Sequence, residues 1–214
     1  MNDASAIDIR RTGNDTRRTL LFLAGWFFVA LWLGVTGKLN QQGGPPIGIG
    51  LAIVLPLVLF AADRRFGSPL FGALARLELP ALIAAQTFRI VGVVFLVAWR
   101  GGTLPGGFAL PAGIGDVAIG LAAPFVAAAV ARRPPRLATA RIWNFLGIAD
   151  LVIAVTSGVL HGRSPIGLLA GGVPTDTLAR YPLSLIPTFF VPLALMLHLT
   201  IARKLAARAG DPSP

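Results

Sequence analysis

Long apolar runs, separated by short polar or turn-forming segments, dominate the pattern along the chain. Six runs have the length needed to cross about 30 Å of hydrocarbon, for which a helix requires about 20 residues. They cover residues 19–37, 47–62, 80–99, 108–131, 142–160 and 184–202. Clusters of Gly and Pro punctuate the gaps as turns. The pattern therefore predicts an all-α protein, a polytopic transmembrane helix bundle of six spans.

The six runs predict one transmembrane domain, residues 19–204, between tails at 1–18 and 205–214. Four arginines precede the first run, as they do in signal peptides. No Ala-x-Ala cleavage site follows that run, so we expect it to be an uncleaved first span.

Two connections between the predicted spans are more apolar than free loops. Residues 68–79 mix apolar side chains with Arg76 and Glu78, and we expect a short helix lying along the membrane surface. Residues 164–183 form a long connection on the other side. They are either a re-entrant or interfacial piece that covers the outer mouth, or an ordered loop packed on the bundle.

Basic residues lie mainly on one side of the predicted spans. Of the 19 Lys and Arg residues, 14 fall on the side of both termini and one, Arg89, lies within a span. The other four are Lys38, Arg100, Arg163 and Arg180. Because loops rich in Lys and Arg stay in the cytoplasm, both termini are predicted to be cytoplasmic.

The composition agrees with an integral membrane protein. Of the residues, 55% are hydrophobic and 13% are charged, whereas soluble domains carry about 25% charged residues. A net charge of +10 would suggest nucleic acid in a soluble protein. Here the basic residues cluster at span ends, so the expected partner is the lipid bilayer and not nucleic acid.

The reactive side chains narrow the possible chemistry. The chain has no Cys and only two His, which excludes disulfides, thiolate catalysis, iron–sulfur clusters and Cys-ligated zinc. His161 and His198 fall near opposite ends of their spans, too far apart for one haem, and His198 is expected at the cytoplasmic interface. No metalloprotease, phosphate-binding or nucleophile-elbow motif is present. We therefore expect no cofactor, no metal site and no catalytic residue.

Three charged residues lie midway along consecutive apolar runs, at similar depth: Arg89, Asp116 and Asp150. An ionised group at such a depth costs at least a few kcal/mol and usually has a partner or a function. Residues three and four positions apart share a helix face. The companions of each charge on that face are small or polar: Ala85, Gln86 and Gly92 for Arg89; Gly113 and Gly120 for Asp116; Asn144, Gly147, Ala154 and Ser157 for Asp150. Small residues mark helix contacts in membranes, so the charges should face the bundle interior.

The two aspartates stand in similar surroundings. Residues 113–119 and 147–153 both read Gly-Ile-small-Asp followed by three apolar residues. Since consecutive spans run in opposite directions, the two copies resemble a short inverted repeat, which in transporters places a site near the midplane.

The three charges have two interpretations. They form either a buried network that fixes helix packing or an ion site. If Arg89 neutralises one aspartate, the other must be protonated, bind a cation or face a polar cavity. We expect Asp116 to pair with Arg89 and Asp150 to be the titrating acid, helped by Asn144 and Ser157, although the assignment could be reversed. The hypothetical substrate or ion site also includes Gln86.

Two prolines in the last run, Pro187 and Pro192, each remove a backbone hydrogen bond and predict a bent helix. The freed carbonyls would line a cavity or form a hinge. The alternative is that they are ordinary, because proline is common in membrane helices.

Four segments together resemble an uncharacterised group of bacterial six-span inner-membrane proteins. They are Phe88-Arg89-Ile90-Val91-Gly92, the run from Leu104-Pro105 through Leu110-Pro111 to Gly115-Asp116, Trp143-Asn144 with Asp150-Leu151, and Pro182 to Phe189. The resemblance covers residues 80–200. It implies a bacterial inner-membrane location and a compact helical fold, and it implies no activity.

Three classes of function fit these observations. The first is a small proton- or cation-linked transporter or permease component built around the Arg/Asp/Asp centre. The second is a non-catalytic accessory or structural subunit of a larger membrane complex, and the third is a membrane-embedded enzyme acting on a lipid-like substrate. The enzyme is disfavoured because no nucleophile lies beside a base. A homo-oligomer or a partner membrane protein is possible under either of the first two.

Overall fold

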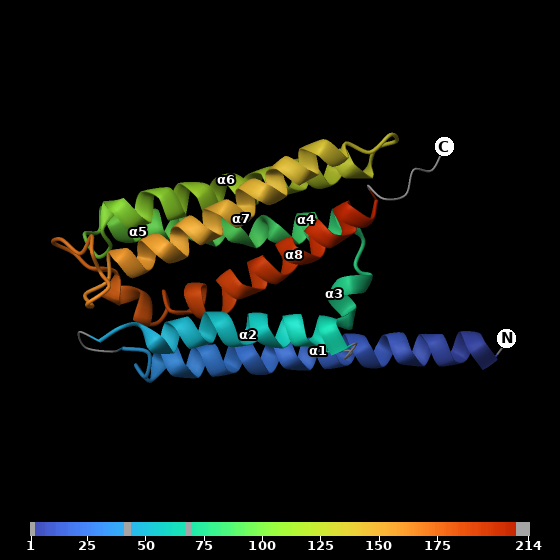
Figure 1. The fold of residues 1–214 in the computed structure, drawn as a ribbon, viewed down its shortest axis with the longest axis horizontal. Coiled ribbons are helices and arrows are strands. Elements are labelled where there is room, and N and C mark those ends of the chain that lie inside the picture. The colour runs from blue at the N-terminus through green and yellow to red at the C-terminus, as the bar shows by residue number, and fades with distance from the viewer. Residues whose placement is uncertain (1–2, 41–43, 67–69, 209–214) are drawn as a thin grey trace.

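The computed structural model describes residues 3–40, 44–66 and 70–208, which form a bundle of antiparallel helices (Figure 1). Within these ranges there is no β-strand, and six helical segments are long and apolar enough to cross a membrane. The predictions of an all-α fold and of six spans are therefore confirmed, and the protein has the architecture of a multi-pass membrane protein.

In the described ranges, eleven helical elements make up these spans and their connections. In chain order they are α1 (Asp3–Val35), α2 (Ile47–Phe66), α3 (Gly72–Arg76), α4 (Leu79–Ala85), η1 (Gln86–Gly92), α5 (Val93–Arg100), α6 (Gly106–Ala131), α7 (Leu137–Leu160), η2 (Thr175–Ala179), η3 (Ile186–Phe190) and α8 (Val191–Ala207). The third span is the continuous series α4, η1 and α5, in which η1 is a 3₁₀-helix. The sixth span begins with η3, one turn of π-helix, and continues as α8.

The helices extend somewhat beyond the expected spans. The first helix starts at Asp3, so it includes most of the segment expected as an N-terminal tail. The fifth span starts at Leu137, earlier than expected, and the sixth runs from Ile186 to Ala207. These extensions lie at the ends of the spans, where polar residues can continue a helix past the apolar run.

The start of α1 and the end of α8 lie at the same end of the bundle, together with α3 and the turn between α6 and α7 (Figure 1). We call this the basic end, because the described parts of the chain place most of the arginines there: Arg17, Arg18, Arg64, Arg65, Arg76, Arg132, Arg133, Arg136, Arg141, Arg203 and Arg208. The other end, called the opposite end, holds Lys38, Arg100, Arg163 and Arg180. The uneven distribution inferred from the sequence thus corresponds to the two ends of the bundle.

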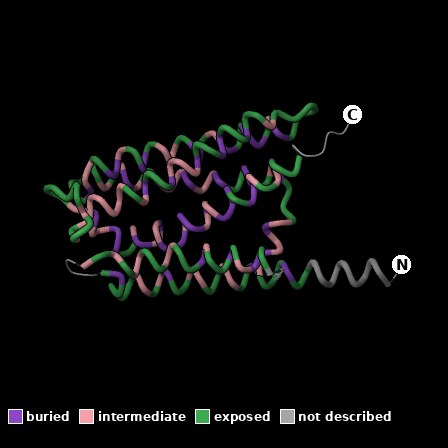
Figure 2. Tube along the Cα trace, in the orientation of Figure 1, coloured by how far each residue is buried: buried purple, intermediate pink, exposed green. Residues whose placement is uncertain are grey.

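The helix α8 forms the centre of the bundle. It packs against α7, α4 and α2, while α6 packs against α7 and the whole third span. In its most apolar stretch the sixth span is 56% buried, compared with 17% in each of the first two spans. Figure 2 shows this contrast between the exposed α1 and α2 and the buried α8. The first two helices are therefore peripheral, and the last four spans form the interior.

Two hydrophobic clusters fill that interior at different heights. The cluster nearer the basic end includes Phe71, Leu82 and Met196. The cluster nearer the opposite end includes Phe108 and Leu151. On α6 and α7 a polar layer separates them, because the buried positions between the two clusters include Asp116 and Asn144.

The two apolar connections have different structures. Within the segment expected as a surface helix, α3 is helical, and its residue Leu74 and the preceding Phe71 are buried in the core. Part of that expected segment, residues 68–69, lies outside the described residues. In the long connection at the opposite end, η2 contributes the buried Leu178. The turn before it exposes Leu168, whose relative accessibility is 81%.

Candidate functional site

The 3₁₀ geometry of η1 directs Arg89 into the bundle. A 3₁₀-helix has three residues per turn, so positions i and i+3 lie directly above one another. Gln86, Arg89 and Gly92 form such a row, and all three are buried. Ala85 is exposed, so the prediction that it shares the face of Arg89 was wrong. That prediction assumed the 3.6-residue period of an α-helix.

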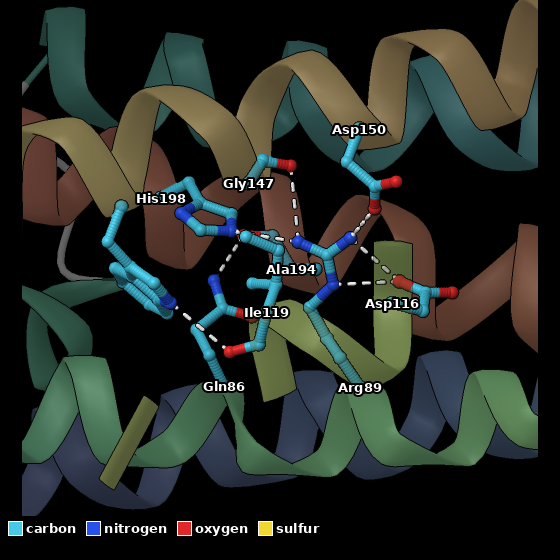
Figure 3. Close-up of polar contacts among 9 residues, drawn as sticks. Gln86, Arg89, Asp116, Ile119, Gly147, Asp150, Ala194 and His198 are labelled. Carbon is cyan, nitrogen blue, oxygen red and sulfur yellow. Dashed lines mark hydrogen bonds and ion pairs between the residues drawn. The ribbon is translucent and has the colours of Figure 1, made fainter. Parts of the chain in front are cut away.

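All five N–H groups of the Arg89 guanidinium can be assigned to acceptors (Figure 3). Nε donates to Asp116 Oδ1 at 2.8 Å, and Nη2 lies 2.7 Å from the same oxygen. Nη2 also donates to Asp150 Oδ2. Nη1 donates to the Gly147 carbonyl at 3.1 Å and to His198 Nε2 at 3.2 Å. Arg89 is only 2% exposed, and this complete set of acceptors is what permits a buried cation.

Asp116 and Asp150 share this single guanidinium. The sequence left open which of them pairs with Arg89, and in the structure both do. Each carboxylate uses one oxygen for Arg89, and its second oxygen points away from the guanidinium (Figure 3). In the described chain, the buried side-chain atoms without a hydrogen-bond partner do not include either of these second oxygens. The side chains of Asp116 and Asp150 retain 8% and 14% of their exposure, so both carboxylates remain partly accessible.

His198 belongs to this centre, contrary to the expectation that it lies at the cytoplasmic interface. Its side chain is fully buried on α8. Arg89 Nη1 can only donate, so His198 Nε2 must accept, and the remaining proton of a neutral ring is then on Nδ1. Nδ1 lies 2.9 Å from Asn144 Oδ1, which can accept that proton. The hydrogen bonds thus define a neutral histidine and connect the predicted site residue Asn144 to Arg89.

The other two predicted site residues have different positions. Gln86 lies one 3₁₀ turn from Arg89, and its Nε2 donates to the Ala194 carbonyl at 3.0 Å. Its Oε1 is buried without a partner. Ser157 lies on α7 two turns beyond Asp150, about 10 Å along the axis. The structure therefore brings Gln86 next to the centre and leaves Ser157 outside it.

Ser157 instead compensates for a proline. Pro111 has no N–H, so the carbonyl of Gly107, four residues earlier, lacks its helical donor. Ser157 Oγ donates to that carbonyl at 3.3 Å. This bond joins α7 to the first turn of α6.

A second proline is compensated in the same way. Pro192 cannot donate to the carbonyl of Thr188, and the indole N–H of Trp26 donates to it at 3.0 Å. The prolines of the sixth span thus coincide with the π-turn η3 and with an attachment point for α1. The sequence predicted a bend in this span; the structure has a π-turn here, and Trp26 donates to the freed carbonyl of Thr188.

Glycine at three positions allows the helices to approach the charged centre closely. A Cβ on Gly92 would lie 2.8 Å from Asp116 Oδ2. A Cβ on Gly115 would meet the carboxylate of Asp150, and one on Gly147 would meet the ring of His198. Any larger residue would therefore displace a member of the centre. Two of these glycines, Gly92 and Gly147, belong to the small-residue stripes seen in the sequence.

A cavity of about 360 Å³ reaches the centre from the opposite end. Its mouth is lined by Arg163 and Asp176, and its walls include Phe108, Leu151 and Val191. Asp116 is the only charged side chain among the remaining lining residues in the described part of the chain. The other carboxylate of the charged centre, that of Asp150, does not line this cavity. Asp116 therefore places a charged group at the inner end of a largely apolar cavity, and we call this inner end the floor.

The arrangement limits the chemistry of the site. No group of three or more His, Cys, Asp or Glu residues able to hold a metal ion occurs in the ranges that the structure covers. The groups that could exchange a proton are the two carboxylates and the histidine. With a neutral His198, one Arg and two ionised Asp carry a net charge of −1. Such a centre suits the binding of one proton or one monovalent cation.

Comparison with known proteins places most of the bundle in one family. The model of a domain of unknown function, DUF8737, matches residues 46–206. This match begins at α2 and includes every residue of the charged centre, whereas α1 lies outside it. Neither a curated protein nor a solved structure matches the chain.

Proposed function

The chain belongs to this family of domains of unknown function, and we propose that it acts as a small proton- or cation-linked transporter or permease component. The observation that carries the proposal is the position of Asp116. One of its oxygens binds Arg89, while the residue also forms the floor of the cavity. Because Asp116 takes part in both, a ligand bound in the cavity can change the contact between Asp116 and Arg89.

The net charge of the centre indicates which kind of ion would be coupled to transport. A net charge of −1 in an apolar layer is strongly disfavoured, because burying an uncompensated ion costs several kcal/mol even after relaxation. One proton or one monovalent cation would remove that cost. Arg89 holds Asp116 and Asp150 together, so a proton on either acid changes the field at the other. The ion therefore belongs to the pair and not to one residue.

The proposed location is the bacterial inner membrane, with both termini in the cytoplasm. The support is the concentration of arginines at the basic end, which the positive-inside rule assigns to the cytoplasm. In this orientation the cavity opens to the outside and the charged centre lies below it. Movement of α8, which contributes His198, would be the simplest way to open the other side.

The accessory-subunit alternative makes a different use of the same residues. In that case the centre fixes helix packing and the bundle contacts a larger complex or a second copy through α1 and α2, whose apolar surfaces are exposed. Lipid covers such surfaces equally well, so the centre and its cavity favour the transporter.

Infrared difference spectroscopy in liposomes tests the proposal. The wild-type protein is compared with Asp116→Asn, Asp150→Asn and the surface control Glu78→Gln. We expect a protonated-carboxyl band near neutral pH that is lost in an aspartate variant and kept in the control. Proton or sodium flux into the same liposomes should disappear in that variant too. Two ionised carboxylates with no bound cation and no flux would refute the proposal and favour a packing network.

A further inference from the structure

The cavity also indicates which kind of molecule would enter it. Its volume of about 360 Å³ lies in the range of small-molecule sites, about 300–1,000 Å³. Its walls are almost entirely apolar, from the aromatic rings of Phe95 and Phe108 to the aliphatic side chains of Leu151 and Val155. A ligand that gains by entering must therefore expose a hydrophobic body of modest size.

The residues at the floor of the cavity determine whether a cationic or an anionic ligand is preferred. At the mouth, Arg163 and Asp176 have opposite charges, and the backbone N–H of Arg163 donates to Asp176 Oδ1 at 2.9 Å. The mouth is therefore close to neutral. At the floor stands Asp116, whose partner Arg89 is itself shared with Asp150.

Two details make the floor attractive to a cation. All five N–H groups of Arg89 are already engaged, so the guanidinium has no donor left for an anionic or carbonyl ligand. Asp116 Oδ2, by contrast, has no hydrogen-bond partner in the described structure and is not completely buried. At the floor, an entering ligand thus meets the free Asp116 acceptor and no free donor of Arg89.

From these observations we infer that the cavity binds an apolar molecule carrying a single cationic nitrogen, a hydrophobic amine, with the ammonium group on Asp116. The hydrocarbon part would occupy the space between α2, α7 and η3. The inference rests on the proposed function, in which it names the class of substrate. The ammonium would take the place of the proton or cation that otherwise neutralises the centre, which is the exchange expected of an antiporter.

The test uses three probes of nearly equal shape: 2-phenylethylammonium, 2-phenylethanol and phenylacetate. Binding is measured by equilibrium dialysis to the full chain in nanodiscs of zwitterionic lipid, with empty nanodiscs subtracted. We expect saturable binding of the ammonium at least tenfold tighter than that of the alcohol, and no saturable binding of the acid. Acidification should weaken ammonium binding, because protons compete for the same site.

Two variants separate the role of the floor from that of the walls. Asp116→Asn should bring the ammonium to the affinity of the alcohol, whereas Glu78→Gln should leave the tenfold preference intact. Val155→Phe narrows the cavity without touching the charged centre, and it should weaken ammonium and alcohol alike. The wild-type comparison of the three probes stands even if Asp116→Asn does not fold.

The outcomes distinguish this inference from the proposed function. Equal binding of ammonium and alcohol to the wild type, or binding that is weak for all three probes as in a cavity filled by lipid, overturns the inference. Tighter binding of phenylacetate also overturns it. In each case a protonated-carboxyl band with proton flux would still support the transporter. Selective ammonium binding without band or flux would support the ligand site and refute coupling.

Discussion

Arg89 is the residue on which the centre depends most, because each of its N–H groups has an acceptor. Replacing it by Lys keeps the charge but loses the planar fork that contacts Asp116 and Asp150 together. We expect Arg89→Lys to lower the free energy of unfolding by about 1–3 kcal/mol, the usual cost of leaving a buried acceptor without its donor. Denaturant unfolding in detergent micelles measures this. The exposed Arg100, changed to Lys in the same way, should alter stability little, and a similar loss in both variants would contradict the assignment.

His198 gives a prediction about the wild-type protein. The hydrogen bonds require a neutral ring with its proton on Nδ1, donated to Asn144. Nitrogen-15 NMR of histidine-labelled protein in bilayers should show this tautomer for the buried histidine near neutral pH, and His198→Gln identifies its signal. A charged ring, or one protonated on Nε2, would be incompatible with the contact to Arg89.

The site could be predicted from the sequence only in part. Arg89, Asp116 and Asp150 were identifiable because an ionisable residue in an apolar run is conspicuous. His198 was missed because its distance from Arg203 suggested an interface, although it too interrupts an apolar run. Ser157 was included because it shares a helical face with Asp150. Residues on one face can still lie two turns apart, which is too far for them to belong to the same site.

At the level of helices, close packing around the centre depends on glycine. Gly115→Ala places a methyl group against the Asp150 carboxylate, and we expect a loss of about 1–3 kcal/mol from overpacking. Gly25→Ala on α1 is the matched control, because no atom lies within 4 Å of its Cβ. It should raise stability by about 0.5–1 kcal/mol, since alanine is the better helix former. Equal effects in thermal unfolding would show that α6 and α7 do not approach as described.

The attachment of α1 to the π-turn gives a second prediction for helices. Trp26→Phe retains the aromatic packing on Phe189 but leaves the Thr188 carbonyl without its donor. We expect a loss of about 1–3 kcal/mol, the cost of an unsatisfied buried acceptor. The exposed Trp32, changed to Phe, should have little effect. If both variants unfold at the same denaturant concentration, another donor must satisfy Thr188.

The sequence pattern predicted the helices but not their type, and the third and sixth spans show why. Six apolar runs were sufficient to place six helices, because apolar length is a strong signal. The change to 3₁₀ geometry at Gln86–Gly92 gave no such signal, since the segment contains no proline. Tertiary contacts of Arg89 on α6, α7 and α8 accompany this geometry, and they are not visible in a local pattern. In the sixth span the prolines did indicate an irregularity, but not that it would be a π-turn.

For the molecule as a whole, orientation is the testable property. The chain contains no cysteine, so a single introduced thiol reports its own side of the membrane. Gly171→Cys lies in the connection at the opposite end and Ala207→Cys at the basic end, and both positions are exposed. In intact cells an impermeant maleimide should label Gly171→Cys and reach Ala207→Cys only after lysis. The reverse pattern would place the termini outside and invert the proposed direction of the cavity.

The sharing of one guanidinium by several helices also sets an order of events during synthesis. Arg89 leaves the ribosome 61 residues before Asp150 and 109 before His198. At about 5–20 residues per second, it waits several seconds for its second carboxylate and longer for the imidazole. During that delay the third span carries an arginine whose contacts are incomplete. We therefore expect it to stay beside the insertion machinery until the later spans arrive, so that the last four helices enter the lipid as a group and not one at a time.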